Sequence, residues 1–370
     1  MYKVGIDARL IGQTGVGVYI RNLLEFLPKK APSDWDIHVY HLCSDAKHLE
    51  SLSKKYILRK ANYKWHTISE QIKFNCDVTR DALDLMHFTY FSYPLLYKRS
   101  FISTIHDLTP LLFRTGKAST RSFFEYNLKY LAMKHVISQA VKNACKIITP
   151  TEAVRTQMID MFGASYQSKM VSIYEGVSAK IQNAKENEKL KEKLPKKFMI
   201  YVGNFYPHKN IERLIKAYLK LSTDVSLILV GPDDYFQKRL LPLFENSNNR
   251  GKTIFYTNPS LEDLVFFYKN AEALVHPSLS EGFGLTLLEA AYFNCPIIAS
   301  DIPVLREVLD SQYTMFDPYD IDDIASKIAG VLKQKTVFKY ERLLERYSFE
   351  TMTEQTVELY KQCLMMKDEG

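Results

Sequence analysis

The sequence predicts an α/β fold with two Rossmann-like domains, each built on a parallel sheet. Short apolar runs of strand length recur along the chain, and most end at a glycine or a polar residue that is followed by a helical pattern. The same order of strand, loop and helix occurs in both halves. The length of 370 residues, with 46% hydrophobic and 25% charged residues, suits two domains, each large enough to bury a core.

The N-terminal half carries the elements of the first domain. A strand at residues 3–8 is followed by a glycine loop at residues 12–17 and by a helix with an apolar stripe. Residues 123–148 form one long helical pattern. Further strands are expected at residues 36–41, 83–88, 101–106, 147–149 and 171–174.

Ligands of open α/β sheets lie beyond the carboxyl ends of the strands, which makes His106 and Asp107 candidates for a site. A histidine at a strand end is more often structural, so its position alone leaves both roles open. Gly15 and Gly17 are spaced like part of a dinucleotide fingerprint, a weak indication on its own.

The C-terminal half repeats the pattern. The strand at residues 198–202 is followed by a loop and a helix, which places Lys209 at a helix N-terminus where an ammonium group and the helix dipole together would hold a diphosphate. Further strands are expected at residues 225–230, 253–256, 273–276 and 296–299, and the chain closes with an amphipathic helix at residues 349–365.

The segment at residues 276–289 carries two carboxylates, Glu281 and Glu289, on either side of a glycine loop that precedes a helix. First-turn N–H groups lack intrahelical partners, so such a helix start binds anions. Two carboxylates beside a phosphate would repel it unless they bind hydroxyls, which suggests a nucleotide sugar. Spacing alone also allows a βα unit with two surface glutamates.

Residues 281–289 resemble the E-x7-E signature of retaining glycosyltransferases with the GT-B fold, in particular glycosyltransferase family 4. Other segments agree in order. Residues 5–9 and 12–19 resemble the first strand and glycine loop of the family, residues 103–108 the strand end with its active-site histidine, and residues 201–210 its basic pyrophosphate-binding loop. The combination is most similar to mannosyltransferase-like members.

The resemblance implies two facing domains with a cleft between them and a C-terminal helix that crosses back to the first domain. The expected boundaries are residues 1–178 for the acceptor-side domain, 179–197 for a linker, 198–348 for the nucleotide-sugar domain and 349–370 for the crossing helix. The linker assignment comes from a lysine- and glutamate-rich stretch without a clear apolar stripe.

By resemblance, Glu281 binds sugar hydroxyls near the reacting carbon, His106 contacts the sugar from the opposite domain, and Glu289 binds the ribose diol. Asp107, next to His106, is also expected to be a catalytic residue. Asn204 stands where the family often has an arginine, so His208 would supply part of the missing positive charge. The remaining expected donor-binding residues are Gly15, Gly17, Gly203, Asn204, His208, Lys209, Gly282, Phe283, Gly284, Leu285 and Thr286.

The expected reaction is retaining transfer of a hexose, from GDP-mannose in the favoured form, to a hydroxyl of a saccharide acceptor by a front-face, ion-pair route. The acceptor could be lipid-linked, as in polysaccharide or lipopolysaccharide synthesis, or soluble. No cofactor or metal is expected, because Lys209 and the helix ends would stabilise the leaving diphosphate, and the pair Asp233 and Asp234 has no third ligand. The alternatives are a sugar-nucleotide epimerase of the same fold and a catalytically silent partner subunit.

The net charge of +7 is uneven, since residues 1–190 hold 27 Lys and Arg against 17 Asp and Glu. Basic residues mixed with aromatic ones at residues 54–65 and 113–146 suit an anionic membrane surface or a phosphorylated lipid; a solvated helical face is the alternative, and nucleic acid is not expected. The scattered cysteines are expected to be reduced and mostly buried. With no leader or membrane-spanning run, a cytoplasmic protein is expected, and contact with the inner face of the cytoplasmic membrane is left open.

Overall fold

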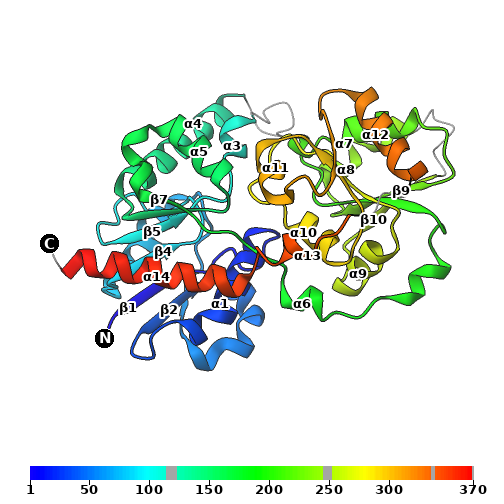
Figure 1. The fold of residues 1–370 in the computed structure, drawn as a ribbon. Helices are drawn as coiled ribbons and strands as arrows, with labels where there is room; N and C mark the ends of the chain where they lie inside the picture. Colours follow the sequence, from blue (N-terminus) through cyan, green and yellow to red (C-terminus); the bar gives the residue numbers. More distant parts are fainter. Residues whose placement is uncertain (114–122, 245–251, 335–337, 369–370) are drawn as a thin grey trace. The chain divides into compact units, whose positions relative to one another are not determined.

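The computed structural model describes residues 1–113, 123–244, 252–334 and 338–368 (Figure 1). Contacts divide the chain into two units. Unit 1 consists of Met1–Glu175 together with Ser348–Gly370, and unit 2 of Gly176–Tyr347. Each unit is built on one parallel sheet, as the sequence predicts.

The sheet of unit 1 has seven strands in the order β3-β2-β1-β4-β5-β6-β7, and every neighbouring pair is parallel. The central strands are buried almost throughout, as is usual for a parallel sheet that is covered on both faces. The strands are β1 (Lys3–Asp7), β2 (Asp36–His41), β3 (Ile57–Lys60), β4 (Leu85–Phe88), β5 (Phe101–Thr104), β6 (Lys146–Thr149) and β7 (Met170–Ser172).

The helices of unit 1 include the C-terminal one. The helix α14 packs along α1, and Lys30 at the end of α1 pairs with Glu350 of α14 at 2.6 Å. The expected return of the last helix to the first domain is therefore observed. The helices are α1 (Val16–Lys30), α2 (Asn75–Arg80), α3 (Thr109–Leu112), α4 (Phe123–Asn143), α5 (Glu152–Phe162) and α14 (Phe349–Asp368), with shorter turns at Cys43–His48, Glu50–Lys55, Glu70–Phe74 and Ala164–Lys169.

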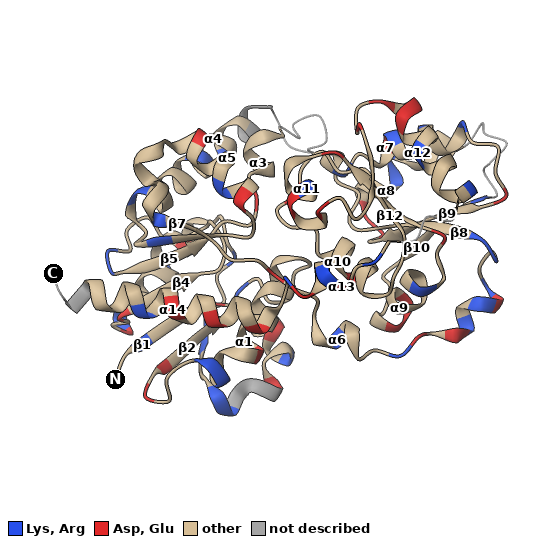
Figure 2. Ribbon diagram, viewed as in Figure 1, with Lys and Arg blue, Asp and Glu red and all other residues tan. Residues whose placement is uncertain are grey.

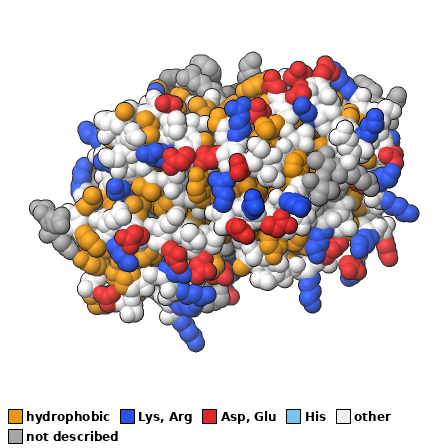
Figure 3. Space-filling view, in the orientation of Figure 1, with side chains coloured by type: hydrophobic (Ala, Val, Ile, Leu, Met, Phe, Trp, Pro, Cys, Tyr) orange, Lys and Arg blue, Asp and Glu red, His pale blue; other side chains and the backbone are white. Residues whose placement is uncertain are grey.

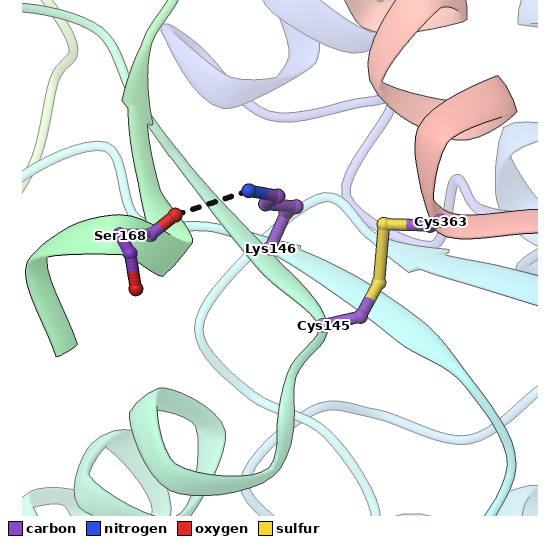
Figure 4. The surroundings of a disulfide bond; sticks show 4 residues. All are labelled: Cys145, Lys146, Ser168 and Cys363. Atoms are coloured by element: carbon purple, nitrogen blue, oxygen red, sulfur yellow. Dashed lines mark hydrogen bonds between the residues drawn. A yellow bond between two sulfur atoms is a disulfide. The ribbon is translucent and has the colours of Figure 1, made fainter. Parts of the chain in front are cut away.

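A disulfide joins Cys145, just before β6, to Cys363 of α14, with 6.4 Å between the two Cα atoms (Figure 4). The expectation that all five cysteines are reduced is therefore wrong for this pair. Cys295 and Cys363 are buried, but Cys43 and Cys76 are exposed, so the expected burial is wrong for these last two. The pairing depends on α14 lying beside β6, which the positions of the cysteines in the sequence do not reveal.

The sheet of unit 2 has six parallel strands in the order β10-β9-β8-β11-β12-β13. Its buried core includes Leu214, Ile215 and Tyr218 of α7, which pack on β8 and β9. The strands are β8 (Phe198–Val202), β9 (Ser226–Gly231), β10 (Thr253–Thr257), β11 (Leu274–His276), β12 (Ile297–Ser300) and β13 (Thr314–Phe316).

The helices of unit 2 connect these strands. They are α6 (Ala179–Gln182), α7 (Ile211–Leu219), α8 (Tyr235–Lys238), α9 (Leu261–Asn270), α10 (Leu285–Tyr292), α11 (Pro303–Leu309), α12 (Ile321–Gln334) and α13 (Glu341–Leu344). Short 3-10 turns lie at Glu188–Glu192, Pro207–Lys209 and Leu241–Phe244.

The segment expected as a linker, residues 179–197, is counted with unit 2. Ile181 and Leu190 are buried, and the Asn187 side chain donates to the Asp263 carboxylate of α9 at 2.7 Å. The two isolated apolar side chains make this segment part of the unit, although they are too few to form a stripe in the sequence.

Candidate functional site

Two loops of unit 2 meet where the order of its strands reverses. β8 and β11 are neighbours in the sheet, although β9, β10 and the helices α7, α8 and α9 lie between them in the chain. Ligands of parallel sheets lie beyond the strand ends at such a reversal. The loop after β8 carries Lys209 and the loop after β11 carries Glu281. The Leu279 N–H donates to the His208 carbonyl at 2.8 Å, so a main-chain hydrogen bond joins the two loops.

Asn210 fixes the end of the first loop. It has a left-handed φ of 61° directly before α7, and it is buried. Its Nδ2 donates to the carbonyls of Pro277, at 3.0 Å, and Pro318, at 2.7 Å. These bonds hold the neighbouring Lys209 against the second loop. The sequence reasoning did not single out Asn210, because both acceptors lie far from it in the chain.

Glu281 accepts two hydrogen bonds on the same oxygen. The Nζ of Lys209 and the Nε2 of His276 each lie 2.6 Å from its Oε1. Burial disfavours the charged carboxylate, but the ammonium of Lys209 and the His276 ring outweigh it and hold the pKa of Glu281 well below its usual range. Glu281 is therefore an anion at neutral pH.

His276, the last residue of β11, is a second residue that the sequence reasoning missed. Its Nε2 faces the Glu281 carboxylate, an acceptor, so this nitrogen carries the proton. The Ser278 hydroxyl lies 3.1 Å from the same nitrogen. The buried Nδ1 of His276 has no hydrogen-bond partner among the described residues. The available signal was a histidine at the end of a buried strand, two residues before a serine.

Glu289 has different surroundings. It lies on α10, and the Tyr268 hydroxyl of α9 donates to its Oε2 at 2.8 Å. Burial raises the pKa of Glu289 to about 7, although the hydrogen bond from Tyr268 acts in the opposite direction. The two carboxylates of the segment therefore have pKa values shifted in opposite directions, and active sites use such differences to give two carboxylates separate roles.

The start of α10 supplies main-chain donors. Gly284 precedes it with a φ of 98°, which favours glycine, and α10 begins at Leu285. The N–H groups of Leu285 and Thr286 lie in the first turn, where no intrahelical acceptor exists. The ring of Phe283 is buried edge-on to Tyr347 at 5.4 Å, so this side chain contributes to packing.

The first loop carries little positive charge besides Lys209. Gly203 follows β8, and the Oδ1 of Asn204 accepts from the Tyr206 N–H at 3.4 Å, which turns that side chain towards its own loop. The His208 ring stacks on Tyr206 with 5.9 Å between centroids. Gly282 is half-buried in the second loop. The predicted residues of unit 2 thus lie on these two loops and on α10.

His106 lies just beyond β5 in unit 1 and is held from three sides. Its Nε2 donates to the Thr89 carbonyl at 3.0 Å, and its Nδ1 lies 3.4 Å from the Glu175 carboxylate. The Tyr19 ring contacts it edge-on with 4.9 Å between centroids. Sequence reasoning named His106 but not Glu175 or Tyr19, because the contacts join distant segments.

The other predicted residues of unit 1 have local structural contacts. The Asp107 carboxylate accepts from the N–H of Thr109, the first residue of the short helix α3, at 2.8 Å. Gly15 precedes α1. At Gly17 a Cβ atom would lie 2.6 Å from the Ile11 carbonyl oxygen, so the main chain is too close for any side chain.

In the part of the chain that the structure describes, no group of three or more His, Cys, Asp or Glu side chains is arranged to hold a metal ion. Of the acidic pair noted in the sequence, Asp234 caps α8 by accepting from the Phe236 N–H at 2.9 Å. This contact gives Asp234 a structural role.

Residues 182–350 match the family model described as glycosyl transferases group 1. The chain is 26% identical over 290 residues to the O-antigen chain mannosyltransferase RfbU of Salmonella typhimurium, a match that covers 78% of this chain and 76% of that protein. It is 29% identical over 252 residues to the serotype-specific mannosyltransferase WbdA of Escherichia coli, where the match covers 64% of this chain but only 30% of the relative.

Solved structures share the fold. The sucrose-phosphate synthase of Thermosynechococcus elongatus superposes with a TM-score of 0.79 at 18% identity, covering 99% of this chain and all of that one. HepE of Anabaena, solved with UDP-glucose, superposes with a TM-score of 0.76 at 17% identity, covering 98% of this chain and all of that one. At such identities the superpositions establish the fold alone. Together, these matches show the GT-B fold and a similarity to glycosyltransferases, mannosyltransferases among them.

Proposed function

We propose that this glycosyltransferase is a retaining mannosyltransferase that uses GDP-mannose as donor. The observation that carries the proposal is the arrangement of Lys209, Glu281 and Glu289 at the strand reversal of unit 2. The mannosyltransferases RfbU and WbdA among the relatives support mannose as the sugar.

Each group of this arrangement has a role that fits its chemistry. Lys209 and the first-turn N–H groups of α10 would stabilise the diphosphate as the bond to the sugar breaks. The anionic Glu281, with Oε1 occupied by Lys209 and His276, would use Oε2 to accept from sugar hydroxyls. Glu289 would accept from the ribose diol. The proposed reaction requires no metal, because fixed cations and N–H groups stabilise the leaving group.

The proposed acceptor is a saccharide in polysaccharide or lipopolysaccharide synthesis, as the name of the O-antigen relative suggests. Transfer assays would present GDP-mannose, UDP-glucose and UDP-galactose with lipid-linked and soluble saccharides, in EDTA and then with added Mg²⁺. The product's anomeric configuration would be read by NMR. Mannose transfer in EDTA with the α-configuration of the donor kept is the expected result. Transfer from UDP sugars alone would contradict the proposed donor. Inversion of the anomeric configuration would contradict the retaining mechanism, and dependence on Mg²⁺ would contradict metal independence.

Contact with an anionic membrane is the second part of the proposal, and it uses a small surface of unit 1. The side chains of Ile68, Ile72 and Leu96 are 78%, 58% and 66% exposed. The segment of Ile68 and Ile72 is joined to that of Leu96, because the Gln71 amide bonds to the main chain of residues 93 and 95 at 3.0 and 2.9 Å. The exposed Lys73 adds positive charge beside them.

The charged residues of the two units do not form a comparable basic surface. Basic and acidic residues alternate on both units (Figure 2), and the face in Figure 3 shows the same mixture. Within the described residues, no helix has the length and apolar character needed to cross a bilayer. Sedimentation with vesicles containing 30% phosphatidylglycerol, set against pure phosphatidylcholine, would test the contact. Ile72→Asp is expected to abolish co-sedimentation, and equal binding of the variant and wild type would reject this surface.

A further inference from the structure

Tyr268 of α9 and Glu289 of α10 form a fixed pair. Tyr268 is fully buried, and its ring stacks on Phe293 with 6.1 Å between centroids and 11° between the ring planes. Phe293 directly follows α10, so the same helix holds the ring and receives the hydroxyl. The hydroxyl oxygen lies 2.8 Å from Oε2 of Glu289.

The direction of this hydrogen bond is determined by the two groups. Burial, together with the charge of Glu289, keeps the pKa of the Tyr268 hydroxyl well above its usual range, so the hydroxyl retains its proton and donates. The bond occupies Oε2. Among the described residues, Oε1 of Glu289 receives no hydrogen bond, which leaves that oxygen available to a ligand.

We propose that Tyr268 is a positioning residue for nucleotide binding, which holds Glu289 by one oxygen and turns the other towards the ribose diol. The inference rests on the proposed function, because it takes Glu289 to be the residue that meets the ribose. The competing explanation is that the bond only ties α9 to α10. The two explanations predict different effects of Tyr268 on nucleotide affinity. A bond that only ties the helices together would affect nucleotides with and without the diol equally.

The pair also predicts a pH dependence of binding. A diol donates to the carboxylate, so nucleotide affinity falls as Glu289 becomes protonated below pH about 7. Since the hydrogen bond from Tyr268 favours the charged form of Glu289, its removal shifts the loss of nucleotide affinity to higher pH. Other titratable groups on the elements packed against α10 are Glu262, Asp263 and Lys269 of α9, His276 of β11, and Glu341 and Arg342 of α13, with Cys295 just beyond α10. Burial and Tyr268 are what shift the pKa of Glu289.

The test compares GDP with 2′,3′-dideoxy-GDP, which lacks the diol, by calorimetry between pH 6 and 8.5. The variants are Tyr268→Phe and Tyr268→Met, the second of which keeps a flexible side chain in the space if the first folds poorly. Tyr218→Phe is the matched control, because Tyr218 is also fully buried in unit 2 and donates to the Val225 carbonyl at 3.0 Å. Each Tyr268 variant is measured again in a Glu289→Gln background.

We expect both Tyr268 variants to weaken GDP about tenfold, as for one lost hydrogen bond to a charged group, and to leave dideoxy-GDP unchanged. The pH below which GDP affinity falls should rise in both variants. In the Glu289→Gln background, the Tyr268 substitutions should no longer change GDP affinity. An equal loss for both nucleotides, or the same loss in Tyr218→Phe, overturns the inference and leaves the proposed function intact. A wild type that does not bind GDP overturns the proposed donor and this inference with it.

Discussion

The Nε2 of His276 lies 2.6 Å from Oε1 of Glu281, the same carboxylate oxygen that pairs with Lys209. The imidazole at the end of β11 and the ammonium in the loop after β8 therefore share one acceptor. Glu281 is thereby fixed from two adjacent strands, and its second oxygen keeps a defined direction.

Lys209→Met is expected to lower the free energy of unfolding by about 3 kcal/mol, because it leaves a buried carboxylate with only one partner. The double variant Lys209→Met with Glu281→Gln should recover part of this loss. Urea unfolding at pH 7 measures both. A single variant as stable as wild type would mean that solvent already compensates the Lys209 pair.

Glu289 should make stability depend on pH between about 4.5 and 7. Its pKa is raised in the folded protein, so the protonated form is favoured there; the stabilisation is complete below the unfolded pKa and is lost as pH rises through about 7. Glu289→Gln removes this dependence. The variant should therefore gain stability relative to wild type as pH rises, with a plateau above pH 7, in urea unfolding at half-unit steps. A constant difference would show that Glu289 titrates normally.

Gly284→Ala is expected to destabilise the protein by about 1–2 kcal/mol. The φ of 98° is unfavourable for alanine, and its Cβ would lie 3.0 Å from the Leu287 side chain. Gly330→Ala is the matched control, because Gly330 lies inside α12 and its Cβ would meet nothing within 4 Å. The control should gain about 0.5–1 kcal/mol. Thermal unfolding compares the two, and equal shifts would contradict the backbone argument.

The disulfide between Cys145 and Cys363 predicts a thiol count. Denatured protein without reductant should expose three thiols, and reduced protein five. Cys363→Ser should lower the unfolding temperature of unit 1, because α14 then loses its covalent attachment. Five thiols without reductant would show that the bond does not form under the conditions of purification, and the variant should then behave as wild type.

Strong local patterns in the sequence predicted most of the fold. The strands β2 and β8 begin and end where the sequence predicts, because each is a bounded apolar run. The strands β3 and β13 were missed. β3 is a mostly exposed edge strand with basic residues, and β13 has only three residues, so neither shows a buried pattern.

The site was predictable in its residue types but not in its pairings. Lys209, Glu281 and Glu289 were named because glycine loops and helix starts mark them. The partners Tyr268 and His276 belong to elements that read as ordinary core, and only the order of the strands brings them to the carboxylates. The same limit explains the cysteines, since 218 residues separate the two that pair.

Unit 1 is formed by two separate segments of the chain, which affects how the protein folds during synthesis. Unit 2 is one continuous stretch of chain, whereas unit 1 needs both the first 175 residues and α14. On the ribosome, unit 2 can therefore complete its fold before unit 1 does. Until α14 emerges, the α1 surface that it covers stays exposed, and the nascent protein is most vulnerable to aggregation during this interval.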